Sequence, residues 1–185
     1  MNSSSLATKF NRDFEVYIKG RDFSPHVLME NIFKHYDMSR SKFIRLTHLD
    51  PSFYSLATKK GHRLSKKSIV TICFAFGIDW PMTEFTLERH GRKLFDERRL
   101  DFAYKYVITH RTDIKIDYEN FLKSERRKEM MKSKYFNEDE CAKELEAIEC
   151  TGGMMIDACN YFLKSSGFKE SDFLGTQSYN IGNNK

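Results

Sequence analysis

The chain has 185 residues, and 40% of them are hydrophobic and 14% aromatic, which supplies one medium-sized core and excludes an intrinsically disordered protein. No apolar run is long enough to cross a bilayer and the first residues, MNSSSLATKFNRDF, lack the apolar part of a secretory signal, so we expect a cytoplasmic protein without a membrane partner. The formal net charge is +5, which leaves room for a polyanionic partner.

The positions of the prolines predict an all-α fold. Pro25, Pro51 and Pro81 each stand where a helix can begin, beside a residue able to cap it, namely Ser24, Asp50 and Asp79. Alternating β-branched stretches bounded by Asn-Gly or Asp-Gly turns are absent from the sequence, so a sheet is not expected.

The first half of the chain predicts an amphipathic helix followed by five short helices. Within residues 1–23, the segment from about Leu6 to Lys19 places Phe10, Phe14, Tyr17 and Ile18 on one face. The helices that follow are expected over residues 25–36, 40–47, 51–60, 68–76 and 82–90, with Gly61 and Gly91 as stops.

The second half predicts further helices and a less apolar C-terminal part. Asp96 is placed to cap an apolar-faced helix that ends near His110, and a short helix is expected over residues 118–122. Residues 124–137 are charged and read as a linker, either a solvated helix or a hinge. Helical patterns at 138–149 and 154–164 form a small element over 138–174, and the polar tail 175–185 is expected to be disordered.

Residues 34–67 carry nine cations and two anions, a local balance of +7, so the rest of the chain is close to neutral or slightly acidic. The same segment contains a sharp corner: His48 and Leu49 are followed by Asp50 and Pro51, which can open a helix. A helix enters the major groove of DNA only when a neighbouring helix braces it at a fixed angle. Phe43, Ile44 and Leu49 are the residues expected to brace this corner.

Two stretches resemble the lambda-repressor-like helix-turn-helix family, also called the xenobiotic response element family. SRSKFIRLTHLDPSFYSLATKKGHRLSKKSIVTICFAFGI is similar to its second to fourth helices, and PMTEFTLERHGRKLFDERRLDFAYKYV resembles a subgroup from low-GC bacteria and their phages. The resemblance covers residues 25–92 and extends to about 122. His48 stands where the family usually has a small residue, and Lys59-Lys60-Gly61 where it often has Glu-x-Gly.

The resemblance implies a module over residues 24–123 that contacts DNA with the helix after the corner. It assigns base contacts to Ser52, Phe53, Tyr54 and Ser55; Tyr54 has the alternatives of stacking on sugar or serving the core, and one of the two aromatic residues is expected to be exposed. Phosphate contacts, which position the protein without reading sequence, are assigned to Arg40, Lys42, Lys59, Lys60, Arg63, Lys66 and Lys67.

The cysteines and histidines predict no catalytic or metal site. Cys73, Cys141, Cys150 and Cys159 are at least nine residues apart, which suits neither a metal clamp nor a disulfide framework. The six histidines have no ligand spacing and no Ser-His-Asp or Cys-His order is present. We therefore expect no enzyme, no metal and no cofactor.

These observations predict a homodimeric, sequence-specific transcriptional regulator, a repressor of bacterial or phage origin, that binds double-stranded DNA. Residues 138–174 cannot bury much alone, so they either fold back on the module or provide a dimer or partner surface. The alternative is a phage or mobile-element inhibitor protein on a helix-turn-helix scaffold, which would bind a nucleic-acid-processing enzyme through this element. Deleting residues 137–185 is expected to distinguish the two functions.

Overall fold

The computed structural model describes residues 24–175, together with residues 8, 11 and 14. These residues form nine α-helices and one short 3-10 helix, with no strand among them, so the all-α prediction is confirmed. None of the helices described is long and apolar enough to span a membrane. The α-helices are α2 Pro25–His35, α3 Arg40–Thr47, α4 Ser52–Ala57, α5 Lys66–Phe76, α6 Trp80–Arg89, α7 Arg99–Thr109, α8 Arg111–Met130, α9 Glu138–Glu146 and α10 Met154–Ser165; the 3-10 helix is η1 Glu170–Asp172.

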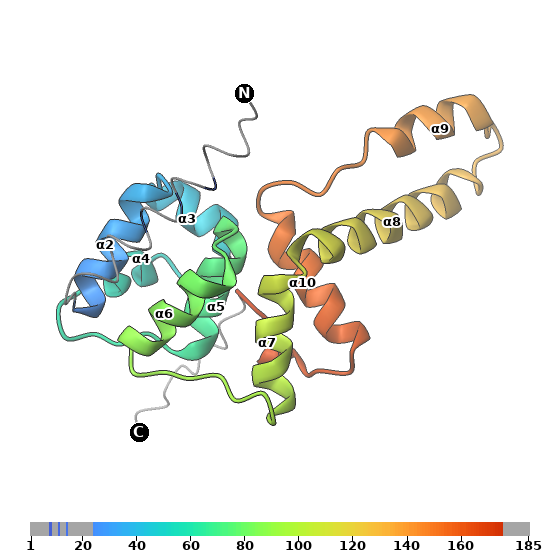
Figure 1. The fold of residues 1–185 in the computed structure, drawn as a ribbon. Helices are drawn as coiled ribbons and strands as arrows, with labels where there is room; N and C mark the ends of the chain where they lie inside the picture. Colours follow the sequence, from blue (N-terminus) through green and yellow to red (C-terminus); the bar gives the residue numbers. More distant parts are fainter. Residues whose placement is uncertain (1–7, 9–10, 12–13, 15–23, 176–185) are drawn as a thin grey trace, which may run out of the picture.

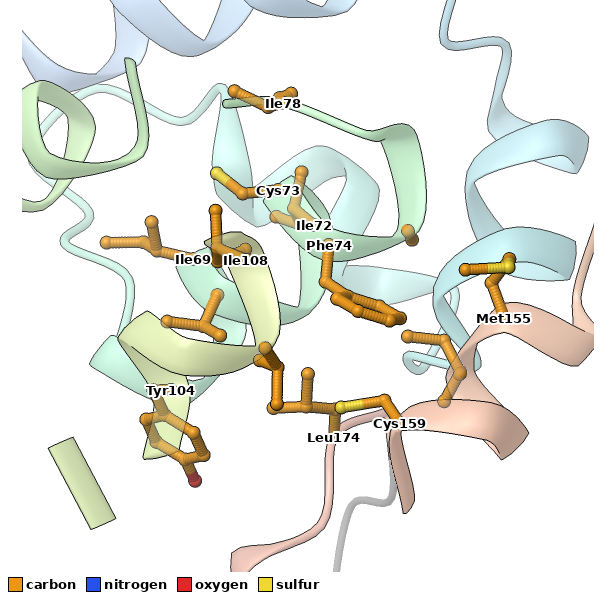
Figure 2. Close-up of a cluster of buried hydrophobic side chains, with 14 of the residues drawn as sticks. Ile69, Ile72, Cys73, Phe74, Ile78, Tyr104, Ile108, Met155, Cys159 and Leu174 are labelled. Carbon is orange, nitrogen blue, oxygen red and sulfur yellow. The ribbon is translucent and has the colours of Figure 1, made fainter. Parts of the chain in front are cut away.

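Helix α5 is the centre of the molecule. The Ser65 side chain accepts the amide of Ser68 to begin it, and Gly77 ends it in the left-handed conformation at φ 67°. Every residue from Ser68 to Ala75 is buried, because α3, α6, α7 and α10 pack around the helix. A helix that is apolar on all sides is stable only inside a core, which explains the run SIVTICFAF (Figure 2).

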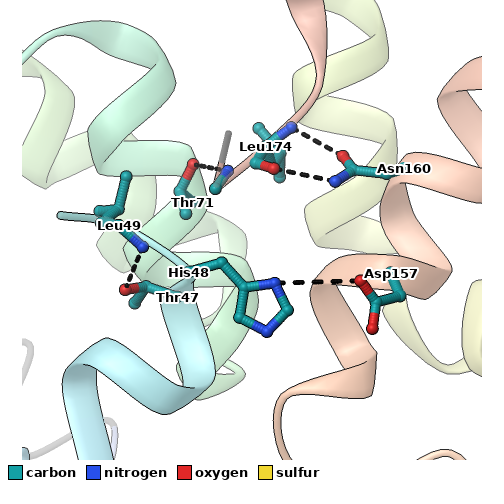
Figure 3. A network of polar contacts seen from close by, with 8 residues as sticks. Thr47, His48, Leu49, Thr71, Asp157, Asn160 and Leu174 are labelled. Carbon is teal, nitrogen blue, oxygen red and sulfur yellow. Dashed lines mark hydrogen bonds and ion pairs between the residues drawn. The ribbon is translucent and has the colours of Figure 1, made fainter. Parts of the chain in front are cut away.

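The C-terminal segment completes the same core. Ile156, Cys159 and Leu163 of α10, and Leu174 beyond it, are each 0% exposed and belong to the cluster that contains α5. The Asn160 side chain accepts the Leu174 amide at 2.8 Å and donates to the Leu174 carbonyl at 2.9 Å (Figure 3). Of the two alternatives for residues 138–174, α10 therefore folds back on the module.

Helices α8 and α9 form an antiparallel arm, residues 111–149, that projects from this body (Figure 1). The expected helix at 118–122 is thus part of a 20-residue helix, and residues 124–130 of the expected linker continue it. The pattern was too polar to reveal the length of α8 because its last turns are exposed and carry ion pairs between neighbouring turns, at Arg126–Glu129 and Lys128–Glu125.

The remaining helix boundaries differ little from expectation. Helix α3 has the predicted bounds, whereas α4 ends at Ala57, short of the predicted Lys60. The predicted helix over residues 6–19 lies mostly outside the described residues; of those described, residues 8, 11 and 14 are helical, and the Phe14 ring stacks on His35 at 4.2 Å. The tail was expected to be disordered over residues 175–185; Gly175 is described and buried, so the expectation is wrong for it, and residues 176–185 lie outside the described part.

Candidate nucleic-acid interface

The corner between α3 and α4 is fixed by local hydrogen bonds. The Thr47 hydroxyl donates to the carbonyl of Phe43 at 2.7 Å and accepts the amide of Leu49 at 3.2 Å. Between them His48 adopts φ 53°, in the left-handed region. This conformation favours glycine, so His48 occupies it at a cost in strain.

Helix α4 is held against α2 and α3 by Tyr54. Its ring lies 5.1 Å from Phe33 and 5.5 Å from Phe43, and its hydroxyl donates to the carbonyl of Met38 at 3.0 Å. The Asp50 carboxylate accepts the amide of Ser52 at 2.8 Å and so starts the helix as the sequence indicated. A half-buried aromatic residue anchored at both its ring and its hydroxyl fixes the angle at which α4 leaves the corner.

The four residues assigned to base contacts divide between surface and core. Ser52 and Ser55 are exposed on α4, whereas Phe53 and Tyr54 are both half-buried and packed against the core. Tyr54 thus takes the core role that was one of its two alternatives, and the expectation that one of the two aromatic residues would be exposed is wrong. The outward surface of this six-residue helix is short and is lined by hydroxyl groups.

Three of the seven cations assigned to phosphate are free on the surface. Arg40 begins α3, and Lys59 and Lys60 follow α4 directly. All three are exposed, and none of their side chains has a hydrogen-bond or ion-pair partner within the part of the chain that the structure describes. Their positions flank the exposed hydroxyls of α4, one before the corner and two behind the helix.

The other four cations have partners inside the protein. Their contacts close helix ends and join helices: Lys42 Nζ donates to the carbonyls of Tyr36 and Asp37, Arg63 to that of Arg89, Lys66 pairs with Asp101 at 2.6 Å, and Lys67 donates to the carbonyl of Ser171 at 2.8 Å. Burial also lowers the pKa of Lys67, with Asp172 acting in the opposite direction. These four side chains stabilise the scaffold, and their ammonium or guanidinium groups are partly used there.

A small hollow beside Lys60 was not anticipated. It has a volume of about 240 Å³ and lies between the start of α2 and the loop that follows α4. His26 and His62 line it with Lys60 and Arg63, and the first amides of α2 face this end of the helix. The histidines were missed because only Lys and Arg were counted as cations; the run from Lys59 to Arg63 was the available signal.

The loop behind α4 is anchored on His90, which is 1% exposed. Its Nδ1 accepts the amide of Leu64 at 3.1 Å, and the Arg92 side chain donates to the carbonyl of the same residue at 3.0 Å. Burial lowers the pKa of His90 to about 4, and the nearby charges of Arg63, His62 and Arg92 act in the same direction. His90 is therefore neutral at pH 7 and serves as a fixed acceptor.

Neither a metal-binding cluster in the described part of the chain nor a similar known protein was found to indicate a function. Among the described residues, no three or more His, Cys, Asp or Glu side chains are grouped to hold a metal ion. No family model, curated protein or solved structure matches the chain. Function is therefore inferred from the geometry alone.

Proposed function

We propose that this protein is a sequence-specific DNA-binding transcriptional regulator of the helix-turn-helix type, with α4 as the reading helix and α3 as its brace. One observation carries the proposal: α4 presents Ser52 and Ser55 outward while Tyr54 locks it to the core, and the unpaired cations Arg40, Lys59 and Lys60 flank it. Polar groups on a braced helix between phosphate-binding cations are what major-groove reading requires.

The roles of the residues follow from this arrangement. Arg40, Lys59 and Lys60 contact phosphates and set the position of the protein on the duplex, while Ser52 and Ser55 approach base edges. Lys66 and Lys67 support the fold, because they connect α5 to α7 and to the segment after α10. Lys60 also faces the hollow at the start of α2, where a phosphate oxygen can accept backbone amides.

A homodimer completes the proposal. Helix α4 has only six residues, so one copy offers few base contacts. Two copies related by a two-fold axis would place two such helices on half-sites about one DNA turn apart, which multiplies the sequence information. Repression is the outcome proposed, since occupancy of a promoter by such a dimer blocks transcription without further machinery.

The test is binding to duplex DNA as a function of salt concentration. Replacing Lys59 and Lys60 by alanine removes two phosphate contacts, so the slope of log K against log salt should become less steep by about two. A control with Lys34→Ala and Lys164→Ala removes the same charge from exposed sites on α2 and α10 and should change the slope far less.

The sequence-reading role of α4 has its own measurement. Selection from a random duplex library should give a consensus for the wild type and a relaxed consensus for Ser52→Ala, Ser55→Ala, with the salt slope unchanged. Absence of duplex binding at moderate salt, or equal slopes for both pairs of lysine variants, would overturn the proposal and favour the inhibitor function instead.

A further inference from the structure

The tip of the arm, residues 130–137, exposes apolar side chains. Among the described residues five large hydrophobic side chains are classed as exposed, and three of them are here: Met131 at 60%, Tyr135 at 87% and Phe136 at 37%. A fourth, Ile116, lies on the same arm. Scattered exposed apolar residues are ordinary on a protein surface, but their concentration on one projecting element marks an interaction site.

Two grooves run along the arm beside the tip. One, of about 770 Å³, is lined by Leu122 and Met131, and the other, of about 350 Å³, by Tyr135 and Phe136. Arg126 and Glu129 line both grooves. Two adjacent grooves are a shape that another helical hairpin can fit, since its side chains enter the grooves.

The arm carries opposite charges on its two halves. Residues 123–134, from the end of α8 and the turn, hold six cations and two anions, a balance of +4, whereas α9 holds five anions and one cation, a balance of −4. Only part of this charge is paired within the arm, as in Arg126–Glu144 and Arg127–Glu138. Several charged side chains have no partner among the described residues: Lys123, Lys132, Lys134, Asp139, Glu140 and Glu146.

We propose that the arm is the surface through which two copies of this chain associate, with the basic half of one arm against the acidic half of the other. A two-fold axis brings a surface against itself, so an interface with equal and opposite charges is satisfied twice. The net charge of the whole chain is +5, yet these two segments together are neutral, so repulsion between copies is smallest here. The acidic α9 also disfavours DNA as the occupant.

The size of the arm is sufficient for a stable interface. The first turns of α8 pack on α10, but residues 123–149 include 22 exposed residues, and a standard interface uses about 20–30 residues from each side. This inference deepens the homodimer proposed above by naming its surface. It stays independent of DNA binding, because association is measured with the protein alone.

The experiment is sedimentation velocity of the full chain, without DNA, up to about 0.1 mM, a range that detects weak specific dimers. Variant A carries Lys132→Glu and Lys134→Glu, and variant B carries Glu140→Lys and Glu146→Lys; none of these residues has an ion pair within the described part of its own chain. Each variant alone places like charges opposite one another, so the dimer Kd should rise at least about tenfold. A 1:1 mixture of A and B should restore a heterodimer.

Two further variants separate the apolar contribution from general charge effects. Tyr135→Ser with Phe136→Ser should raise the dimer Kd at least about tenfold, since exposed aromatic anchors dominate such interfaces and their removal leaves the fold intact. Lys34→Glu with Lys164→Glu makes the same charge change as A outside the arm and should leave the Kd unchanged.

The outcomes decide the inference clearly. A wild type that stays monomeric over the whole range overturns it. So does a dimer that persists equally in A, B and the aromatic variant, because its interface would lie elsewhere. If the arm variants are monomeric but retain binding to a single DNA half-site, the arm is the dimer surface and the proposed function stands; if the wild type is an arm-dependent dimer that ignores DNA, only the proposed function fails.

Discussion

At the scale of single residues, His90 links the stability of the protein to pH. Its imidazole is buried and accepts the Leu64 amide, and its pKa is lowered from 6.5 to about 4. Between these two values the unfolded chain takes up a proton at this residue and the folded protein does not. The stabilisation is therefore complete above about pH 6.5 and is lost as pH falls toward 4.

We expect His90→Asn to flatten this dependence. The Asn side-chain oxygen can accept the Leu64 amide in place of Nδ1, but it does not titrate. Chemical denaturation measures the free energy of unfolding at pH 7.5 and at pH 5. Between these pH values the wild type should lose up to about 2 kcal/mol more of it than the variant, because the complete pKa shift of His90 corresponds to roughly 3 kcal/mol. Equal losses in the two proteins would show that His90 is not the group responsible.

The cations show what the sequence can predict about the site at this scale. The outward position of Ser52 and Ser55 was implied by the resemblance to the helix-turn-helix family, and the start of their helix was indicated by Asp50, which is a local feature. The internal roles of Lys66 and Lys67 did not, because their partners Asp101 and Ser171 are 35 and 104 residues away in the chain. A cation's partner depends on tertiary packing, so a count of local charge overestimates the surface available to phosphate.

At the scale of elements, the contact between the C-terminal segment and the α3–α4 corner allows no added volume. A Cβ at Gly175 would lie 2.5 Å from the Thr47 carbonyl oxygen and 3.0 Å from the Cβ of His48, and φ there is +72°. Gly61 has a similar φ of +80° but no atom within 4 Å of such a Cβ. Alanine at Gly61 therefore introduces backbone strain alone, whereas alanine at Gly175 introduces backbone strain and steric crowding.

Gly175→Ala should accordingly destabilise the protein by about 2–4 kcal/mol, against about 1–2 kcal/mol for Gly61→Ala. Urea denaturation followed by circular dichroism measures both values. Because the crowded atoms belong to Thr47 and His48, we also expect Gly175→Ala to weaken DNA binding. Similar stability costs for both substitutions would mean that the segment shifts without strain.

Helix prediction at this scale succeeded where a helix has both an apolar face and a cap. Helix α3 has a capping serine, Ser39, and its bounds were predicted without error. Helix α8 begins directly after His110 without a side-chain cap and buries only Ile114, so its length was not visible in the periodicity. Its charged turns are stabilised by ion pairs and by α9, and neither contributes to an apolar pattern.

At the scale of the whole molecule, the core depends on residues from both ends of the described chain. Truncation after Glu149 removes Ile156, Leu163 and Leu174, each 0% exposed. Burying one such side chain contributes about 1.5–3 kcal/mol, and a domain has only about 5–15 kcal/mol of net stability. We therefore expect the truncated protein to lose its cooperative thermal transition in calorimetry and to bind a hydrophobic dye.

The matched control removes residues 176–185 and leaves every described contact in place, so its transition should persist. A cooperative transition in the longer truncation would contradict the shared core. The sequence suggested that deleting residues 137–185 would distinguish a regulator from an inhibitor. The structure argues against this experiment, because the deletion would unfold the core around α5 and abolish either function. The sequence predicted α10 as a helix, but its attachment to α3 and α5 is a long-range property that periodicity does not contain.

The burial of Leu174 has a consequence for synthesis of the protein. The core around α5 lacks one side of its packing until α10 and Leu174 have emerged from the ribosome. The nascent chain therefore carries α2 to α8 with exposed apolar surface while the residues after α8 are translated, a stage at which chaperones bind. Cells would tolerate destabilising substitutions near the C-terminus less well than their distance from α4 suggests, because they prolong this vulnerable stage.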